Sequence, residues 1–213
     1  MRSARITHDC PSTGLVGYWI GRLVLTLLGW RVEGEPPAGR KFLLIAAPHT
    51  SNWDFPIGIA VTYLLRIKIH WVGKHTLFRW PYGGIMRWLG GIGVDRTNPA
   101  GVAEQLAQRI RTSERIILAI TPDGTRGPRK YWKSGFYRIA QAADVPLLCG
   151  YLDYASKTAR LGLCFVPTGD IPADMARIRT FYAGASGANP KNHTPIRLRE
   201  ELEKPLSGQD QCA

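Results

Sequence analysis

His49 and Asp54 are the residues whose types and spacing first suggest chemistry, in the segment AAPHTSNWDFPIG at 46–58. A carboxylate that accepts the Nδ1–H of a histidine fixes the ring tautomer, stabilises the imidazolium and leaves Nε2 as a general base. In a continuous helix the two residues would lie about 140° apart around the axis and could not touch. His49 follows Pro48 at the end of an apolar run, however, so a turn before the helix can fold it back over Asp54. The sequence has no GxSxG nucleophile elbow, so the histidine would activate a hydroxyl of a substrate.

Asp54 also fits a purely structural role at the start of a helix. Ser51 and Asp54 form an S-x-x-D pattern before an apolar run, which is a capping-box signature. A capping carboxylate accepts free backbone N–H groups and lies favourably in the helix dipole, and His49 would then be an ordinary loop residue. Because a carboxylate has several acceptor positions, one aspartate can cap the helix and hold the histidine at once. The sequence leaves both interpretations open.

Two glycine-containing segments are further candidates for binding an anion. GGIGVDR (90–96) ends in Arg96. DGTRG (123–127) combines a glycine turn, the hydroxyl of Thr125 and the guanidinium of Arg126, which together can cradle a phosphate. The structural alternatives are a surface ion pair of Arg96 with the preceding aspartate and a plain loop turn at 123–127.

The elements that must position these residues are visible as apolar runs separated by glycine and proline. Strands are predicted at 41–48, 68–74, 92–96, 115–122, 145–154 and 160–170. Helices are predicted at 54–66, 98–112, 136–144, from about 174, and at 77–91, the last one broken by Pro81 and Gly83–Gly84. Strands that alternate with helices predict an α/β fold with a mostly parallel sheet flanked by helices. The final strand is expected to pair with the one before it.

The predicted sheet brings the candidate residues together. In a parallel α/β sheet the ligand site lies beyond the carboxyl ends of the strands. His49, Arg96 and the 123–126 turn each follow a predicted strand directly. Three separate strands would therefore deliver these groups to one edge, which favours a single site.

The charge balance favours an anionic partner. Lys plus Arg number 28 against 16 for Asp plus Glu, so the net charge of the 213-residue chain is +12. In RKYWKSG (129–135) the cations Arg129, Lys130 and Lys133 alternate with aromatic residues. That pattern suits nucleic acid, the phosphates of a cofactor or a surface of lipid headgroups. The four cysteines form no CxxC pair, which argues for a reducing compartment and against a zinc site.

The segment LVGYWIGRLVLTLLGW (15–30) predicts an N-terminal amphipathic helix. Its 16 residues, interrupted by Arg22, fall short of the roughly 20 apolar residues that span a bilayer. Its tryptophans and tyrosine favour a membrane–water boundary, so the helix either lies on a bilayer or packs on the core. We expect residues 1–32 to form a membrane-surface helix and residues 33–213 to form a single domain.

The order of these segments resembles the glycerophosphate and lysophosphatidate acyltransferase family, typified by bacterial 1-acylglycerol-3-phosphate acyltransferases. The blocks of that family are His-x4-Asp, a Gly-rich segment ending in Arg, Glu-Gly-Thr-Arg and Val-Pro. This sequence has, in the same order, HTSNWD (49–54), GGIGVDR (90–96), DGTR (123–126) and VP (145–146). The segment at 73–90 is similar to the family's stretch between the first two blocks, and Lys133 and Gly135 match its Lys-x-Gly. The resemblance covers roughly residues 40–155.

The resemblance implies an acyltransferase-type fold and an O-acyl transfer reaction. A fatty acyl group would pass from a thioester of coenzyme A or acyl carrier protein to a hydroxyl of a lysophosphatidate-like acceptor, in phospholipid biosynthesis. His49 would be the general base and Asp54 its partner, with backbone N–H groups near the helix start as candidates for stabilising the oxyanion. The residues implied in binding the acceptor or its phosphate are Lys74, Arg96, Asp123, Gly124, Thr125 and Arg126. Those assigned to the donor or to the membrane surface are Arg129, Lys130 and Lys133.

The expected partners are an anionic membrane surface, the acyl donor and a lysophospholipid acceptor, with no metal, no other cofactor and no nucleic acid. The expected location is cytoplasmic and peripherally bound to the membrane, the inner membrane in a bacterium. The sequence departs from the family pattern at Pro48, Gly93, Asp123 and Gly127. Because these departures fall mostly in the acceptor-binding blocks, another lipid alcohol such as a lyso-aminolipid stays open as the acceptor. A non-enzymatic binder of anionic lipid or nucleic acid is the alternative class, which explains the charge but not the ordered blocks.

Overall fold

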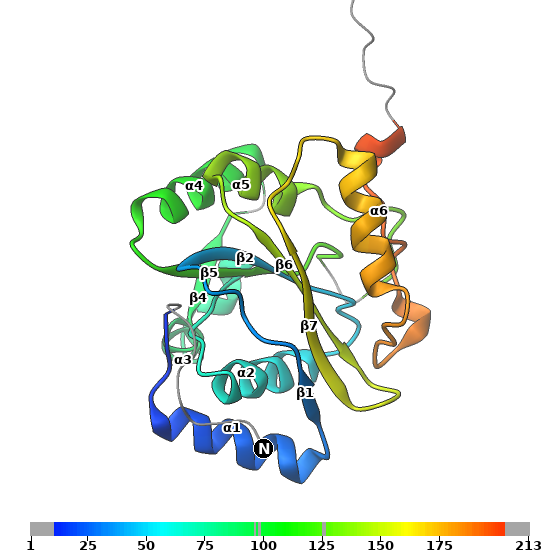
Figure 1. Ribbon diagram of the computed structural model, residues 1–213. Helices are drawn as coiled ribbons and strands as arrows, with labels where there is room; N and C mark the ends of the chain where they lie inside the picture. Colours follow the sequence, from blue (N-terminus) through cyan, green and yellow to red (C-terminus); the bar gives the residue numbers. More distant parts are fainter. Residues whose placement is uncertain (1–10, 96, 98, 125–126, 203–213) are drawn as a thin grey trace, which may run out of the picture.

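Seven strands form one sheet in the residues that the structure describes, which are 11–95, 97, 99–124 and 127–202. The structure is a computed structural model (Figure 1). The strands, in spatial order, are β1 (Arg31–Glu33), β7 (Thr158–Phe165), β6 (Leu147–Asp153), β2 (Lys41–Ala46), β5 (Ile116–Ile120), β3 (His70–Lys74) and β4 (Gly91–Val94). Neighbouring strands are parallel except β6 and β7, which run antiparallel. The predicted α/β fold with a mostly parallel sheet is therefore confirmed, as is the pairing of the last two strands.

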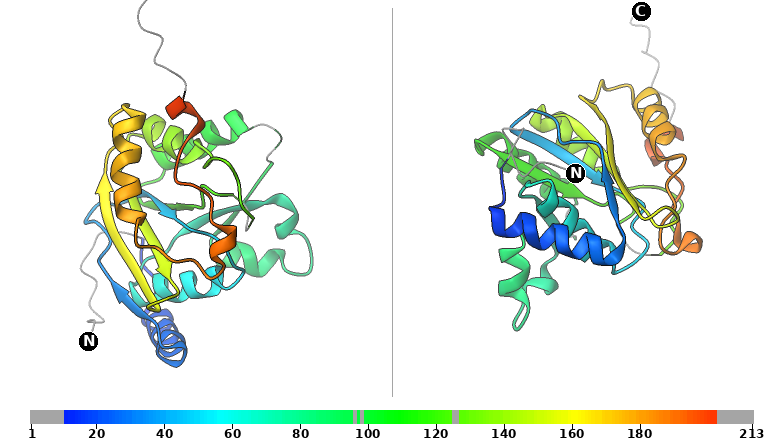
Figure 2. Two further views of the ribbon diagram at one scale, coloured as in Figure 1. Left: turned by 90° about the vertical axis from the view of Figure 1, so that its right-hand side faces the viewer. Right: turned by 60° about the horizontal axis from the view of Figure 1, so that its bottom comes forward.

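Helices cover both faces of this sheet (Figures 1 and 2). One face carries α1 (Leu15–Leu28) and α2 (Asp54–Leu64), and the other carries α4 (Pro99–Thr112), α5 (Gly135–Ala143) and α6 (Ile171–Tyr182). The short helix α3 (Gly83–Trp88) lies beside β4. Three 3₁₀ turns complete the described elements: η1 (His75–Phe78), η2 (Pro190–Asn192) and η3 (Arg199–Leu202).

The side chains of the central strands alternate between two cores. In β2, Phe42 and Leu44 pack on the side of α1 and α2, whereas Leu43 and Ile45 pack on the side of α4, α5 and α6. Successive side chains of a strand point to opposite faces. A strand covered on both sides therefore has a continuous apolar sequence. This is why β2 could be predicted from the sequence.

The helix α1 packs on α2 by one face and exposes the other. Tyr18, Gly21 and Leu25 form its buried face. A Cβ at Gly21 would lie 2.5 Å from the carbonyl oxygen of Ala60, so only glycine permits this close approach. The large apolar residues exposed on α1 are Leu15, Val16, Trp19, Ile20, Leu23, Leu27 and Leu28. Packing on the core, one of the two predicted alternatives, is thus observed. Within the described ranges, every helix is too short or too polar to cross a membrane.

Two local predictions were wrong. Residues 31–33 form the edge strand β1 beside β7, where the sequence predicts no strand. This three-residue strand has no apolar run of its own and depends on its pairing with β7. Gly83 begins α3, although the sequence predicts a helix that breaks there. Pro81 lies in the preceding turn, where its missing amide hydrogen removes no helical hydrogen bond.

Candidate active site

The parallel strands β2, β3, β5 and β6 point their carboxyl ends at one edge of the sheet. The residues at or just after these ends include His49, Lys74, Asp123 and Tyr154. The sequence predicted this convergence for His49 and the 123–126 turn. It missed Tyr154, although this residue directly follows β6 and the same rule applied to that strand would have found it.

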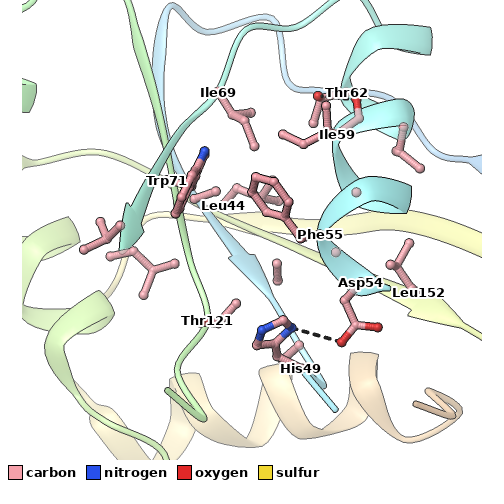
Figure 3. Close-up of a pocket in the computed structure, with 18 of the residues that line it drawn as sticks. Leu44, His49, Asp54, Phe55, Ile59, Thr62, Ile69, Trp71, Thr121 and Leu152 are labelled. Atoms are coloured by element: carbon pink, nitrogen blue, oxygen red, sulfur yellow. Dashed lines mark hydrogen bonds and ion pairs between the residues drawn. The ribbon is translucent and has the colours of Figure 1, made fainter. Parts of the chain in front are cut away.

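His49 and Asp54 form a hydrogen-bonded pair at this edge (Figure 3). Nδ1 of His49 lies 3.0 Å from Oδ2 of Asp54, and both side chains are mostly buried. Because α2 begins only at Asp54, the residues before it can turn and fold the imidazole back. The same Oδ2 accepts the backbone N–H groups of Thr50 and Ser51, each at 2.9 Å. Asp54 therefore accepts hydrogen bonds from the amides before α2 and also contacts the histidine, so the structural role does not exclude the contact that a catalytic pair requires.

The contact fixes which nitrogen of His49 can act as a base. An ionised carboxylate oxygen only accepts hydrogen bonds, so the proton of the neutral imidazole lies on Nδ1. Nε2 then carries the free lone pair.

Tyr154 completes the surroundings of the Asp54 carboxylate. Its hydroxyl donates to Oδ1 of Asp54 at 2.7 Å. Burial alone would raise the pKa of Asp54, but hydrogen bonds from His49, Tyr154 and the Ser51 amide outweigh it and hold the pKa below its usual value. Burial and the neighbouring carboxylate raise the pKa of Tyr154, so its hydroxyl keeps the proton that it donates.

Asp123 is buried behind the pair and contacts the backbone of the His49 loop. Its Oδ2 accepts the backbone N–H of His49 at 2.5 Å, and its Oδ1 accepts the N–H of Gly124 at 3.1 Å. Only 2% of Asp123 is exposed, and it is not among the residues that line the cavity described below. Burial raises the pKa of Asp123 to about 6, although both amide hydrogen bonds and His49 act in the opposite direction. The structure thus gives this predicted acceptor-binding residue contacts inside the protein.

These contacts use three backbone amides that precede α2. The N–H groups of His49, Thr50 and Ser51 each donate to a carboxylate of the protein. These three amides are therefore occupied by contacts within the protein.

An apolar cavity of about 630 Å³ extends from the histidine between α2 and the sheet. His49 and Asp54 lie at one end of it, and Ile59, Thr62 and Ile69 lie at the other (Figure 3). The side chains drawn between the two ends are Leu44, Phe55 and Trp71. Its volume falls in the range of roughly 300–1,000 Å³ that small-molecule sites occupy.

Some of the predicted anion-binding residues lie beside this cavity. Lys74 and Gly124 line it, and Lys74 is exposed. The side chain of Lys133 lies over Gly124: a Cβ built on this glycine, whose φ is +71°, would lie 3.1 Å from Cε and 3.4 Å from Nζ of Lys133. Lys133 is therefore close to the site, whereas the sequence assigned it to the donor or the membrane surface.

The remaining predicted site residues fall into two groups, those that the structure describes and those outside the described residues. Arg129 and Lys130 are exposed, and their backbone groups contact Thr194 and Arg197 near the C-terminal end of the described chain. Three predicted acceptor-binding residues lie outside the described residues: Arg96, Thr125 and Arg126.

The fold and this site belong to a known class of protein. A family model described as acyltransferase matches residues 30–151, over half of the chain, so the chain belongs to the acyltransferase family. The glycerophosphate and lysophosphatidate acyltransferase family that the ordered blocks resemble is thereby confirmed.

Individual relatives agree with this assignment. The 1-acyl-sn-glycerol-3-phosphate acyltransferase of Haemophilus influenzae is 30% identical over 147 residues, which are 64% of this chain and 59% of that protein. The chain thus spans less than two thirds of the length of that relative. The crystal structure of PlsC, the 1-acyl-sn-glycerophosphate (LPA) acyltransferase of Thermotoga maritima, superposes with a TM-score of 0.55 at 17% identity. That superposition covers 91% of this chain and 81% of the other, and it supports the fold.

Proposed function

We propose that the protein is an O-acyltransferase that moves a fatty acyl group from a thioester to a hydroxyl of a lysophosphatidate-like acceptor. The observation that carries this proposal is the His49–Asp54 pair, with Nδ1 and Oδ2 3.0 Å apart, at one end of an apolar cavity. Family membership and the named activity of the Haemophilus relative support the same reaction.

The chemistry follows from the hydrogen bonds of the pair. Nε2 of His49 removes the proton from the acceptor hydroxyl while its oxygen attacks the thioester carbonyl carbon. Asp54 stabilises the imidazolium that forms. The tetrahedral oxyanion then collapses, the C–S bond breaks, and the imidazolium returns its proton to the departing thiolate. General base catalysis of this kind contributes about 10²–10⁴ in rate.

The cavity suits the acyl chain of the donor. Its lining between α2 and the sheet is mainly aliphatic and aromatic, and His49 lies at one end. An acyl chain bound along the cavity would place its thioester carbonyl at the imidazole. Burial of apolar chain stabilises binding by about 0.8 kcal/mol for each methylene group.

The phosphate of the acceptor would be bound by cations at the same edge. Lys74 lines the cavity, and Lys133 lies over Gly124 in the third motif. Ammonium groups bind phosphate as point charges without a fixed fork geometry. A phosphorylated acceptor would therefore place its free hydroxyl between these cations and Nε2 of His49.

We further propose that the protein binds an anionic membrane surface through two exposed apolar segments. The first is the outer face of α1, where Leu27 is 76% exposed. The second contains η1 and α3, where Trp80 is 93% and Trp88 74% exposed. Exposed apolar surface of this extent marks interaction sites, tryptophan favours the membrane boundary, and the net charge of +12 complements anionic lipid.

Free-thiol release measured over a matrix of donors and acceptors tests the reaction. The donors are acyl-coenzyme A and acyl carrier protein thioesters, and the acceptors include lysophosphatidate, glycerol 3-phosphate and a lyso-aminolipid. We expect release that depends on lysophosphatidate. Release with the lyso-aminolipid alone would keep acyl transfer and replace the acceptor, and no release with any pair would overturn the proposal.

A further inference from the structure

We propose that Tyr154 is a positioning residue of the catalytic pair, whose hydroxyl fixes the orientation of the Asp54 carboxylate. The Tyr154 hydroxyl donates to Oδ1 at 2.7 Å, and the Nδ1 of His49 contacts Oδ2 at 3.0 Å. The two side chains thus contact opposite oxygens of one carboxylate. The inference rests on the proposed role of the pair as a general base.

The carboxylate needs such a contact because its own torsion is soft. The angle about the Cβ–Cγ bond of an aspartate is broad and roughly two-fold, unlike a staggered sp³ torsion. Oδ2 of Asp54 accepts hydrogen bonds from His49, Thr50 and Ser51, which all lie on one side of the group. A donor at Oδ1 stops the plane of the carboxylate from turning away from the imidazole. A shift of about 1 Å in a catalytic group can cost about 10²-fold in rate.

Tyr154 is itself held by contacts from two other parts of the chain. Its backbone N–H donates to the carbonyl oxygen of Ser186 at 2.9 Å. Its ring packs edge-to-face on Trp30, with centroids 5.0 Å apart and planes at 87°. Trp30 is 8% exposed, and its backbone N–H donates to the carbonyl oxygen of Leu25 in α1. The hydroxyl is therefore pre-organised toward Asp54 by the segment that follows α6 and by the residue that follows α1.

Replacing the tyrosine with phenylalanine isolates the hydroxyl. Tyr154→Phe keeps the ring that packs on Trp30 and removes the donor to Asp54. We expect kcat to fall by about tenfold or more while the KM values for donor and acceptor stay within about twofold, because positioning of the base acts on the chemical step. The matched control is Tyr63→Phe on α2, which lines a separate groove and should leave both parameters unchanged. A Tyr154→Phe enzyme with the kcat of the wild type would overturn the inference.

A double-mutant cycle with Asp54→Ala tests the contact independently of turnover. Removing the hydroxyl from the wild type should lower Tm by about 3–12 °C, the loss of one partly buried hydrogen bond to a charged group. In the Asp54→Ala background the hydroxyl has lost its acceptor, so Tyr154→Phe should leave Tm unchanged or raise it. An equal loss of Tm in both backgrounds would show that the hydroxyl does not act through Asp54. If the wild type turns over no substrate, the proposed function fails, while the cycle still decides whether Tyr154 holds the carboxylate.

Discussion

The buried carboxylate of Asp123 accepts the backbone N–H of His49 at 2.5 Å, across 74 positions of the sequence. The contact joins the loops that follow the neighbouring strands β2 and β5. It fixes the backbone of the residue whose side chain is proposed to be the base. Asp123, from the DGTR segment, therefore supports the HTSNWD segment through a contact inside the protein.

The pH dependence of stability should reveal this carboxylate. The folded pKa of Asp123, about 6, lies above its ordinary value of 3.8, so the protonated form favours the folded state. The contribution of protonated Asp123 to the free energy of unfolding is complete below about pH 4 and is lost as pH rises through about 6. The shift corresponds to about 3 kcal/mol. We expect the free energy of unfolding of the wild type, relative to Asp123→Asn, to fall by that order between pH 4 and pH 7.5, measured by urea unfolding.

Asp153→Asn is the matched control for this titration. The pKa of Asp153 is lowered, since hydrogen bonds from Ser156 and nearby amides outweigh the effect of its burial. The stabilisation that ionised Asp153 provides is therefore lost only as pH falls below the ordinary pKa of an aspartate. The difference in free energy of unfolding between the wild type and Asp153→Asn should stay flat between pH 5 and 7.5. Parallel pH curves for the wild type and Asp123→Asn would contradict the assigned pKa.

The acyl-chain assignment predicts that Gly58→Leu shortens the preferred donor. Gly58 lies one turn along α2 from Asp54 and lines the cavity, and a Cβ there meets nothing within 4 Å. A leucine would fill the cavity without a backbone clash, and it favours the helix over glycine by about 1 kcal/mol. We expect kcat/KM for long-chain donors to fall at least about tenfold while short-chain donors keep their rate.

Gly84→Leu on α3 serves as the control for chain-length selection. Gly84 has equally open space and does not line the cavity. Its length profile should match that of the wild type. A Gly58→Leu enzyme with an unchanged length profile would place the acyl chain elsewhere.

The membrane assignment predicts that two pairs of exposed residues govern vesicle binding. Replacing Leu23 and Leu27 of α1, or Trp80 and Trp88 around α3, with glutamine should each reduce co-flotation with phosphatidylglycerol vesicles several-fold. Substitution is preferable to deletion of α1, because the buried face of that helix packs on α2.

Exposed apolar residues elsewhere provide the control for flotation. Val166 and Leu202 are 52% and 63% exposed, after β7 and in η3. Replacing both with glutamine should leave flotation as in the wild type. Equal flotation by all three double variants would contradict the proposal that these two apolar segments bind the membrane.

The sequence predicted the elements that have a strong local pattern. β2 and β5 are continuous apolar runs because helices cover both faces of the sheet. The amphipathic period of α4 shows in its three buried residues Leu106, Ala107 and Ile110. From these elements, the rule for parallel sheets was enough to bring His49 and Asp123 to one edge.

The contacts that refine the site have no local pattern. Tyr154 and Asp54 are 100 positions apart, and Asp123 and His49 are 74 apart. Each contact depends on how two loops meet after their strands have paired, which spacing along the chain does not encode. The strand β1 was missed for a similar reason, since Arg31–Glu33 becomes a strand only through its pairing with β7.

Acceptor-dependent thiol release by His49→Ala tests the central claim most directly. The side chain is at one end of the cavity and its removal leaves Asp54 bound by Thr50, Ser51 and Tyr154, so the variant should stay folded by circular dichroism. The exposed His193→Ala is the matched control. We expect His49→Ala to lose turnover by at least about 10²-fold, the lower contribution of a general base, with His193→Ala unchanged. A folded His49→Ala protein that turns over at the wild-type rate would contradict the role of the pair.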